Sequence, residues 1–231
     1  MFFPFDPTFL LLIPAMLFAF WAQWKVQSTY SRFSKVQATN GRTGREMAIA
    51  IMSRNGVSDV GVEEVGGMLS DHYDPRARKV RLSGHNYHDR SISSIAVAAH
   101  EVGHVLQHAE GYAPLQIRTA IAPVAGFGSM LAMPLFFIGL LFSMPGISGL
   151  LMDAGIILFS GAVLFQVVTL PVEFDASKRA LAQLTTTGAV APQEVSQAKQ
   201  VLDAAALTYV AAAAVSALHL VRLVLLRNSR D

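Results

Sequence analysis

The run His100-Glu101-Val102-Gly103-His104 carries the clearest chemical information in this chain. On a helix, histidines four residues apart lie on one face, about 6 Å apart along the axis, so both imidazoles can reach one metal ion. Glu101 points roughly 100° further around the helix and can face a metal-bound water without binding the metal. We therefore predict that His100 and His104 are metal ligands and that Glu101 is a general base. The alternative is a chance match on an amphipathic helix.

The chain contains no cysteine, which excludes disulfide bonds and thiolate ligands. A zinc site must then use His, Asp or Glu side chains, a set that suits an open catalytic site better than a closed structural one. Catalytic zinc has three protein ligands and keeps its fourth position for water. The sequence must therefore supply one ligand besides the two histidines.

Several residues are candidates for the third ligand. The metzincin pattern is excluded, because Gln107 stands at its glycine position and Glu110 at its third histidine position. His108 lies about 12 Å along the helix from His100, too far to share one ion. Two apolar segments follow the HExxH run, and two membrane crossings return the chain to the side of the membrane from which it started. Every acidic residue from 173 to 203 could therefore serve as the third ligand. Glu173, at the end of the third apolar run, is the preferred candidate, although a carboxylate is also favoured at a helix start for its dipole.

The composition predicts a membrane protein. The chain is 52% hydrophobic and only 15% charged, and its mean hydropathy is +0.42, whereas soluble domains have about 25% charged residues. The formal net charge is +2 and no basic stripe is interleaved with aromatic residues, so no nucleic acid partner is indicated. The sequence does not indicate an oligomeric state.

The apolar run at 9–24 is followed by Lys25, Arg32 and Lys35, which predicts an uncleaved anchor with the next segment in the cytoplasm. We expect five segments: an N-terminal transmembrane anchor (1–24), a cytoplasmic region with the HExxH helix (25–118), a transmembrane hairpin (119–171), a helical region with the third ligand (172–207), and a C-terminal apolar helix (208–231).

The hairpin is predicted from two apolar runs, 121–142 and 154–171, each long enough to cross a bilayer of about 30 Å. Small residues such as Gly126, Gly155 and Gly161 are expected to let its two helices pack closely.

The last apolar run, 208–226, is interrupted by His219 and Arg222, so two interpretations stay open. If it spans the membrane, Arg227 and Arg230 lie outside, against the positive-inside trend. The alternative is a helix packed along the hairpin or in the interface. The expected fold is a mainly α integral membrane protein with three or four transmembrane helices.

The water-facing region has its own local signals. The segment from Val60 to Ser83 predicts short strands and turns, so a small β-sheet beside the HExxH helix is expected. Thr43 is a plausible helix cap, and Ser91 or Ser93 is expected to cap the HExxH helix. Gly103 has no Cβ and therefore leaves space on the helix surface beside the metal. Glycine destabilises a helix by about 1 kcal/mol relative to alanine, so its presence predicts close approach by another element or by substrate. The strand near Val80 could pair with an extended substrate at a free edge.

The runs HEVGH and VEFDAS, separated by an apolar hairpin, resemble the HExxH and ExxAD pattern of HtpX-like and CAAX prenyl protease membrane metallopeptidases. The runs DHYDPRARKVRLS, AAHEVGHVLQH and VEFDASKRAL are more closely similar to the YugP-like neutral zinc metallopeptidases. This resemblance covers most of the chain after the first anchor. It implies a zincin-like (gluzincin) helix and one catalytic Zn²⁺ ion held by His100, His104 and Glu173.

Two features depart from the HtpX-like pattern. Ser177 stands where an Asp is expected, so either Ser177 or Asp175 could orient a ligating histidine. No HPP-like element follows, so no residue can be assigned to stabilise the oxyanion.

The resemblance implies a membrane-embedded zinc metalloendopeptidase that hydrolyses membrane-associated or misfolded polypeptides. Its expected partners are a polypeptide substrate and the lipid bilayer, in a bacterial plasma membrane, with the active site facing the cytoplasm. The alternatives are a processing peptidase of narrow specificity and a non-enzymatic zinc-binding membrane scaffold.

Overall fold

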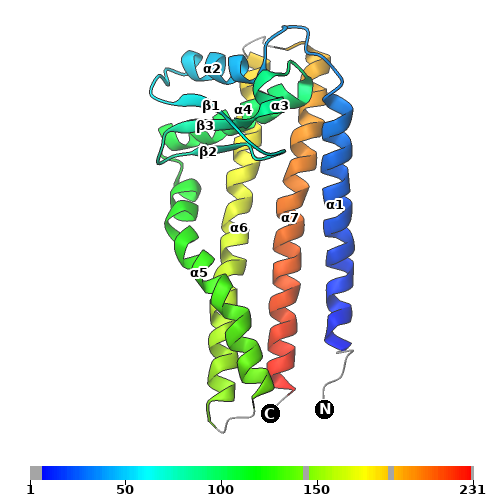
Figure 1. Ribbon diagram of the computed structural model, residues 1–231, viewed down its shortest axis with the longest axis vertical. Helices are drawn as coiled ribbons and strands as arrows, with labels where there is room; N and C mark the ends of the chain where they lie inside the picture. The colour runs from blue at the N-terminus through cyan, green and yellow to red at the C-terminus, as the bar shows by residue number, and fades with distance from the viewer. Residues whose placement is uncertain (1–6, 143–145, 187–189, 230–231) are drawn as a thin grey trace. The chain divides into compact units, whose positions relative to one another are not determined.

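The computed structural model describes residues 7–142, 146–186 and 190–229; the predicted hairpin connection at 143–145 and Arg230 lie outside the described residues. The elements, in chain order, are the 3₁₀ helix η1 (Pro7–Leu11), α1 (Leu12–Phe33), α2 (Gly44–Arg54), β1 (Gly61–Val65), β2 (His72–Asp74), β3 (Lys79–Ser83), α3 (Gly84–His88), α4 (Ile92–Ala109), α5 (Ala113–Leu141), α6 (Ser148–Thr186) and α7 (Pro192–Asn228) (Figure 1). The predicted fold class, mainly α-helical with a small sheet, is confirmed.

The chain forms two compact units, and each is described by itself. The first unit contains Met1–Trp21, Ile117–Leu170 and Thr208–Asp231. The second unit contains Ala22–Gln116 and Pro171–Leu207, and therefore includes the sheet and the HExxH helix.

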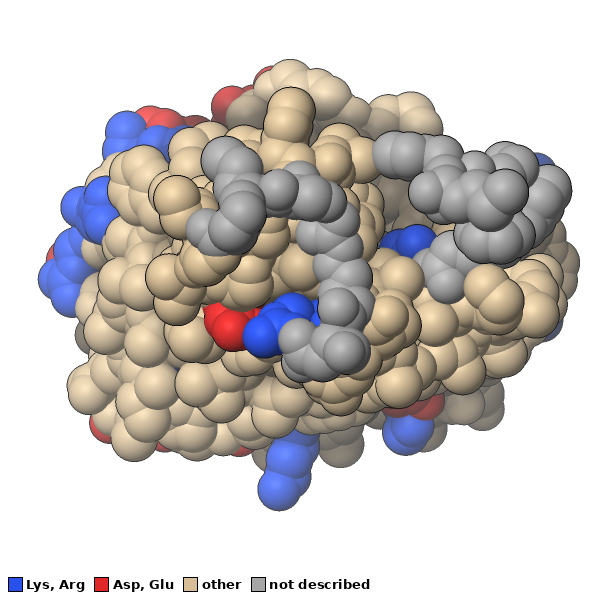
Figure 2. Space-filling view, turned by 90° about the horizontal axis from the view of Figure 1, so that it is seen from below, with Lys and Arg blue, Asp and Glu red and all other residues tan. Residues whose placement is uncertain are grey.

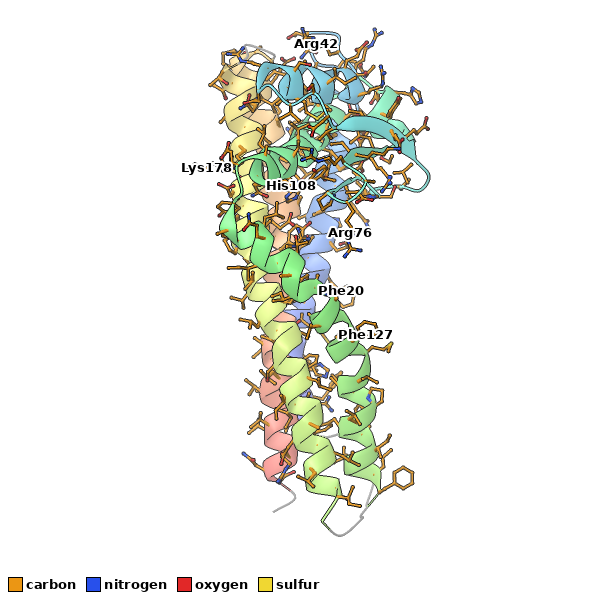
Figure 3. The ribbon with its side chains drawn as sticks, turned by 90° about the vertical axis from the view of Figure 1, so that its left-hand side faces the viewer. Phe20, Arg42, Arg76, His108, Phe127 and Lys178 are labelled. Carbon is orange, nitrogen blue, oxygen red and sulfur yellow. The ribbon has the colours of Figure 1, made fainter. Side chains whose placement is uncertain are left out.

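Four helical segments are long and apolar enough to cross a membrane: Pro7–Phe33, Ala113–Leu141, Ser148–Thr186 and Pro192–Asn228. Large apolar side chains of the first unit face outward, for example Phe20 (67% exposed) and Phe127 (69% exposed), both labelled in Figure 3. The face seen in Figure 2 consists largely of residues without charge. Such a surface is unfavourable in water and suits a lipid environment.

Small residues let α5 and α6 pack closely in the first unit. A Cβ built on Gly155 would lie 2.7 Å from the carbonyl oxygen of Ala132, and one on Gly139 would lie 2.5 Å from that of Ser148. The prediction for Gly155 is thus confirmed. A Cβ on Gly126 or Gly161 would have no neighbour within 4 Å among the described residues outside its own helix backbone, so this close contact does not involve these two glycines. Within this unit, Arg227 on α7 donates from Nε to Asp153 Oδ1 at 2.8 Å. The cation that directly follows the last apolar run therefore has an acidic partner.

The second unit is built from capped helices around one core. Thr43 caps α2 in a reciprocal capping box with Glu46, and Ser91, rather than Ser93, caps α4. The caps satisfy backbone N–H groups that a helix start leaves without partners. The largest fully buried apolar side chains of this core are Met47, Ile51, Leu82, Ile92, Ile95, Leu184, Val80 and Val102.

The sheet has the order β1-β3-β2, with β1 parallel and β2 antiparallel to β3, and Figure 1 shows the strands one below another in this order. Val80 pairs with Val62 on one side and with Tyr73 on the other. The prediction that the strand near Val80 offers a free edge is therefore wrong, because both edges of β3 are already occupied within the sheet.

Candidate metal centre

Helices α4 and α6 bring together the three residues that the sequence indicates as metal ligands. One ligand atom from each of His100, His104 and Glu173 lies within 4.8 Å of the others, and no second group of this kind occurs among the described residues. The Nε2 atom of His100 is 3.3 Å from Glu173 Oε2, and the Nε2 atom of His104 is 3.6 Å from the same oxygen. All three side chains belong to the second unit.

The donor set fits a zinc ion in type and in spacing. Two imidazoles and one carboxylate form a common catalytic zinc set, and a tetrahedral ion with bonds of about 2.0–2.1 Å holds its donors roughly 3.3 Å apart. The measured separations of 3.3 and 3.6 Å are close to this value. Glu173 is only 3% exposed, and a buried carboxylate requires a cationic or hydrogen-bonding partner.

The local field also favours a cation at this point. Burial lowers the pKa of His104, but the hydrogen bond and the negative charge of Glu173 raise it by more, so the pKa lies above its ordinary value. The same negative charge that favours a proton on this imidazole attracts a metal cation.

Glu101 lies on α4 between the two histidines and is 7% exposed. Burial raises the pKa of its carboxyl group, the charges of the two histidines lower it, and the charges of Glu173 and Asp71 raise it again. The net direction is upward, which makes Glu101 a better proton acceptor than an exposed glutamate.

The contact between the two helices depends on Gly103. A Cβ at this position would come closest to the carbonyl oxygen of Ala176, and would lie 3.0 Å from the carbonyl carbon and 3.1 Å from Cα of that residue. The close approach predicted from this glycine is confirmed, and the neighbouring element is the backbone of α6.

Each of the two histidines has a side-chain partner at Nδ1. His100 Nδ1 is 3.1 Å from Ser177 Oγ, and His104 Nδ1 is 3.0 Å from Gln107 Oε1. Asp175 contacts the amide of Gln107 at 2.9 Å and so reaches His104 through that side chain. Gln107 was not identified as a partner from the sequence, and the signal that could have found it is its position three residues after His104, on the same helix face.

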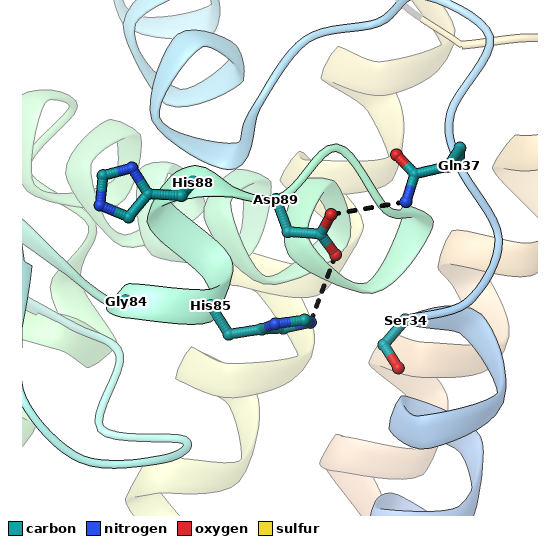
Figure 4. Close-up of a pocket in the computed structure, with 6 residues that line it drawn as sticks. All are labelled: Ser34, Gln37, Gly84, His85, His88 and Asp89. Carbon is teal, nitrogen blue, oxygen red and sulfur yellow. Dashed lines mark hydrogen bonds and ion pairs between the residues drawn. The ribbon is translucent and has the colours of Figure 1, made fainter.

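The remaining histidines have other contacts. His108 Nδ1 is 2.7 Å from the hydroxyl of Tyr73, which agrees with the interpretation that it is a neighbour and not a ligand. A separate pocket of about 560 Å³ is lined by Ser34, Gln37, Gly84, His85, His88 and Asp89. In this pocket, Asp89 contacts His85 and Gln37, and the ring of His88 points away from Asp89 (Figure 4).

An HExxH helix that meets a carboxylate from another helix, in a chain with four apolar helices, has the features of a membrane-bound metallopeptidase. The chain belongs to the family described as "Putative neutral zinc metallopeptidase", whose model matches residues 8–228. It is also 51% identical to "Putative membrane protease YugP" of Bacillus subtilis (strain 168) over 222 residues, which is 96% of this chain and 97% of that protein. No solved structure matches the chain.

Proposed function

We propose that this protein is a membrane-embedded zinc metalloendopeptidase, in which His100, His104 and Glu173 hold one zinc ion. The observation that carries this proposal is the convergence of three donors at 3.3 and 3.6 Å, two of them buried (His104 and Glu173) and one partly buried (His100). Family membership supports the choice of zinc, and the name of the Bacillus relative supports a membrane protease.

Zinc bound at this site would lower the pKa of a water molecule toward about 7 and polarise the substrate carbonyl. Glu101 takes the proton from the attacking water and later delivers it to the leaving amine. Ser177 and Gln107 hold the two imidazoles at their Nδ1 atoms, so that both Nε2 atoms face Glu173.

The proposed substrates are membrane-associated or misfolded polypeptides, and the proposed location is a bacterial plasma membrane with the site on the cytoplasmic side. The cations that follow the first apolar run, Lys25, Arg32 and Lys35, support this orientation. In the same scheme, 1–24 is an anchor and 119–171 is a membrane hairpin.

The orientation can be tested with single thiols, because the chain has no native cysteine. Ala77 and Ile147 are exposed positions suitable for substitution by cysteine. In intact cells, a membrane-impermeant thiol reagent should label Ile147→Cys and leave Ala77→Cys unlabelled. The reverse pattern would show that the proposed topology is inverted.

The activity is tested by comparing zinc content and proteolysis of unfolded and membrane polypeptides among purified variants. Glu101→Gln should abolish cleavage and retain zinc, whereas Glu173→Ala should lose both. Glu64→Gln is the matched control, because Glu64 is an exposed carboxylate paired with His88 and should affect neither. If the wild-type protein binds zinc but cleaves no polypeptide, the protein is a scaffold. If it cleaves a single partner only, it is a processing peptidase.

A further inference from the structure

We infer that Gln107 is a positioning residue that selects the tautomer of His104 and thereby prepares its Nε2 atom to bind metal. The inference rests on the proposed zinc site. It adds a residue outside the HExxH run and the carboxylate, and it gives that residue a specific chemical task.

Gln107 is completely buried, and each polar atom of its amide has a partner. The Nε2 group donates to the backbone carbonyl of Val172 at 2.7 Å and to Asp175 Oδ2 at 2.9 Å. The Oε1 atom is 3.0 Å from His104 Nδ1. One side chain on α4 therefore contacts the backbone of α6, an acid on α6 and a candidate ligand.

Only one orientation of this amide is compatible with its surroundings. The carbonyl oxygen of Val172 and the carboxylate of Asp175 are acceptors only, so both must face the NH₂ group of Gln107. Rotation of the amide by 180° would place Oε1 against two acceptors in a buried site, where each lost hydrogen bond costs about 1–3 kcal/mol. The Oε1 atom is therefore fixed toward His104.

The fixed orientation determines the protonation of the imidazole. Because Oε1 can only accept, His104 Nδ1 must carry a hydrogen and donate it. Neutral His104 then has its lone pair on Nε2, the atom that lies 3.6 Å from Glu173. A neutral imidazole with a free lone pair on this side is the form that binds zinc.

The partner of the other histidine imposes no such choice. Ser177 Oγ, at 3.1 Å from His100 Nδ1, can donate or accept. Gln107 therefore fixes the tautomer of its histidine, whereas Ser177 does not. We expect loss of the Gln107 amide to weaken zinc binding more than loss of the Ser177 hydroxyl.

Asp175 is itself anchored. Arg179 Nε donates to Asp175 Oδ2 at 2.6 Å, and Arg179 Nη1 donates to Glu110 Oε2, just past the C-terminus of α4, also at 2.6 Å. Arg179 thus ties Asp175 to the end of the HExxH helix, and Asp175 in turn accepts directly from Gln107. Asp175 therefore orients His104 indirectly, through the amide of Gln107.

The first test measures zinc affinity by chelator competition in the full-length protein. Gln107→Met keeps the side-chain volume and removes the hydrogen bonds, and we expect it to weaken zinc binding by about 10–100-fold. Ser177→Ala should weaken it less. Gln183→Met is the control, because Gln183 is a partly buried glutamine that is hydrogen-bonded to Asn55 away from the site, and it should leave the affinity unchanged. An affinity for Gln107→Met equal to that of the wild type would overturn the inference.

The second test needs no variant and reads the tautomer directly. In zinc-free wild-type protein at alkaline pH, ¹⁵N NMR of labelled histidine should show His104 with its hydrogen on Nδ1. A hydrogen on Nε2 would contradict the inference even if Gln107→Met failed to fold. Neither readout uses proteolysis, so a protein that binds zinc through this arrangement but cleaves nothing would refute the peptidase proposal and leave the role of Gln107 intact.

Discussion

Substitution of Gly103 by alanine tests whether the spacing of α4 and α6 determines metal binding. The added Cβ would lie 3.0 and 3.1 Å from two backbone carbons of Ala176, whereas carbon atoms pack most favourably at about 3.5–4.0 Å. The two helices must therefore separate by roughly 0.5–1 Å at this point. Gly103 directly precedes His104, and Ala176 lies one turn after Glu173, so the separation acts on the donors themselves.

The expected effect on function exceeds the effect on stability. Overpacking costs about 1–3 kcal/mol, while replacing glycine by alanine in a helix returns about 1 kcal/mol, so the free energy of unfolding should fall by roughly 0–2 kcal/mol. A misplacement near 1 Å can reduce catalysis about 10²-fold, and the donor separations of 3.3 and 3.6 Å would increase. We expect Gly103→Ala to stay folded with much weaker zinc binding and about 10²-fold lower turnover.

The assays are chelator competition, peptide hydrolysis and thermal unfolding in the same detergent. Gly161→Ala is the matched control, because Gly161 lies on α6 and, in the part of the chain that the structure describes, a Cβ there would meet no atom within 4 Å outside its own helix backbone. It should retain zinc affinity and turnover. Wild-type zinc affinity and turnover in Gly103→Ala would refute the argument, and so would an equal loss in both alanine variants.

Three further predictions concern metal removal, acid and an ion pair. Chelation should lower the unfolding temperature, because it leaves the buried carboxylate of Glu173 without its cation, and zinc but not magnesium should restore it. Hydrogen bonds from the backbone N–H of Ala77 and from the side chain of Arg81 lower the pKa of Asp74 to about 2. This carboxylate therefore stabilises the fold above its unfolded pKa of about 3.9, and the advantage of wild type over Asp74→Asn in urea unfolding should disappear as the pH falls toward 2. Arg227→Gln should lower the free energy of unfolding by about 1 kcal/mol or less, because the ion pair that it breaks is partly exposed.

Features encoded within a few neighbouring residues could be predicted from the sequence. The spacing of His100 and His104 fixes their common face on one helix, and Thr43 and Ser91 cap their helices as their side chains indicate. Glu173 is different, because 68 residues separate it from His104 in the chain. The two predicted membrane crossings after the HExxH helix place every acidic residue from 173 to 203 on the same side of the membrane as that helix. The resemblance to known metallopeptidases was needed to select one of them.

Strand order and helix length could not be predicted. The alternation at 79–83 predicts a strand, but only pairing with β1 on one side and β2 on the other makes it central, and the alternation does not specify these partners. Pro171 was expected to end an apolar segment, yet α6 continues through it to Thr186. Proline removes one backbone donor, and such a loss can be tolerated where neighbouring groups satisfy the freed carbonyl. Glu173 consequently lies inside a long helix and not at a helix start.

The contrast between Gly103 and Gln107 shows which side-chain roles a sequence can reveal. Glycine inside a helix costs about 1 kcal/mol, so its presence at position 103 already implies a compensating contact. Glutamine is an ordinary helix former, and at position 107 it gives no such signal. Its role depends on the carbonyl of Val172 and the carboxylate of Asp175, which reach it only after α6 has packed on α4. The position of Gln107 three residues after His104 admits a hydrogen bond, but only those two acceptors determine the direction in which its amide points.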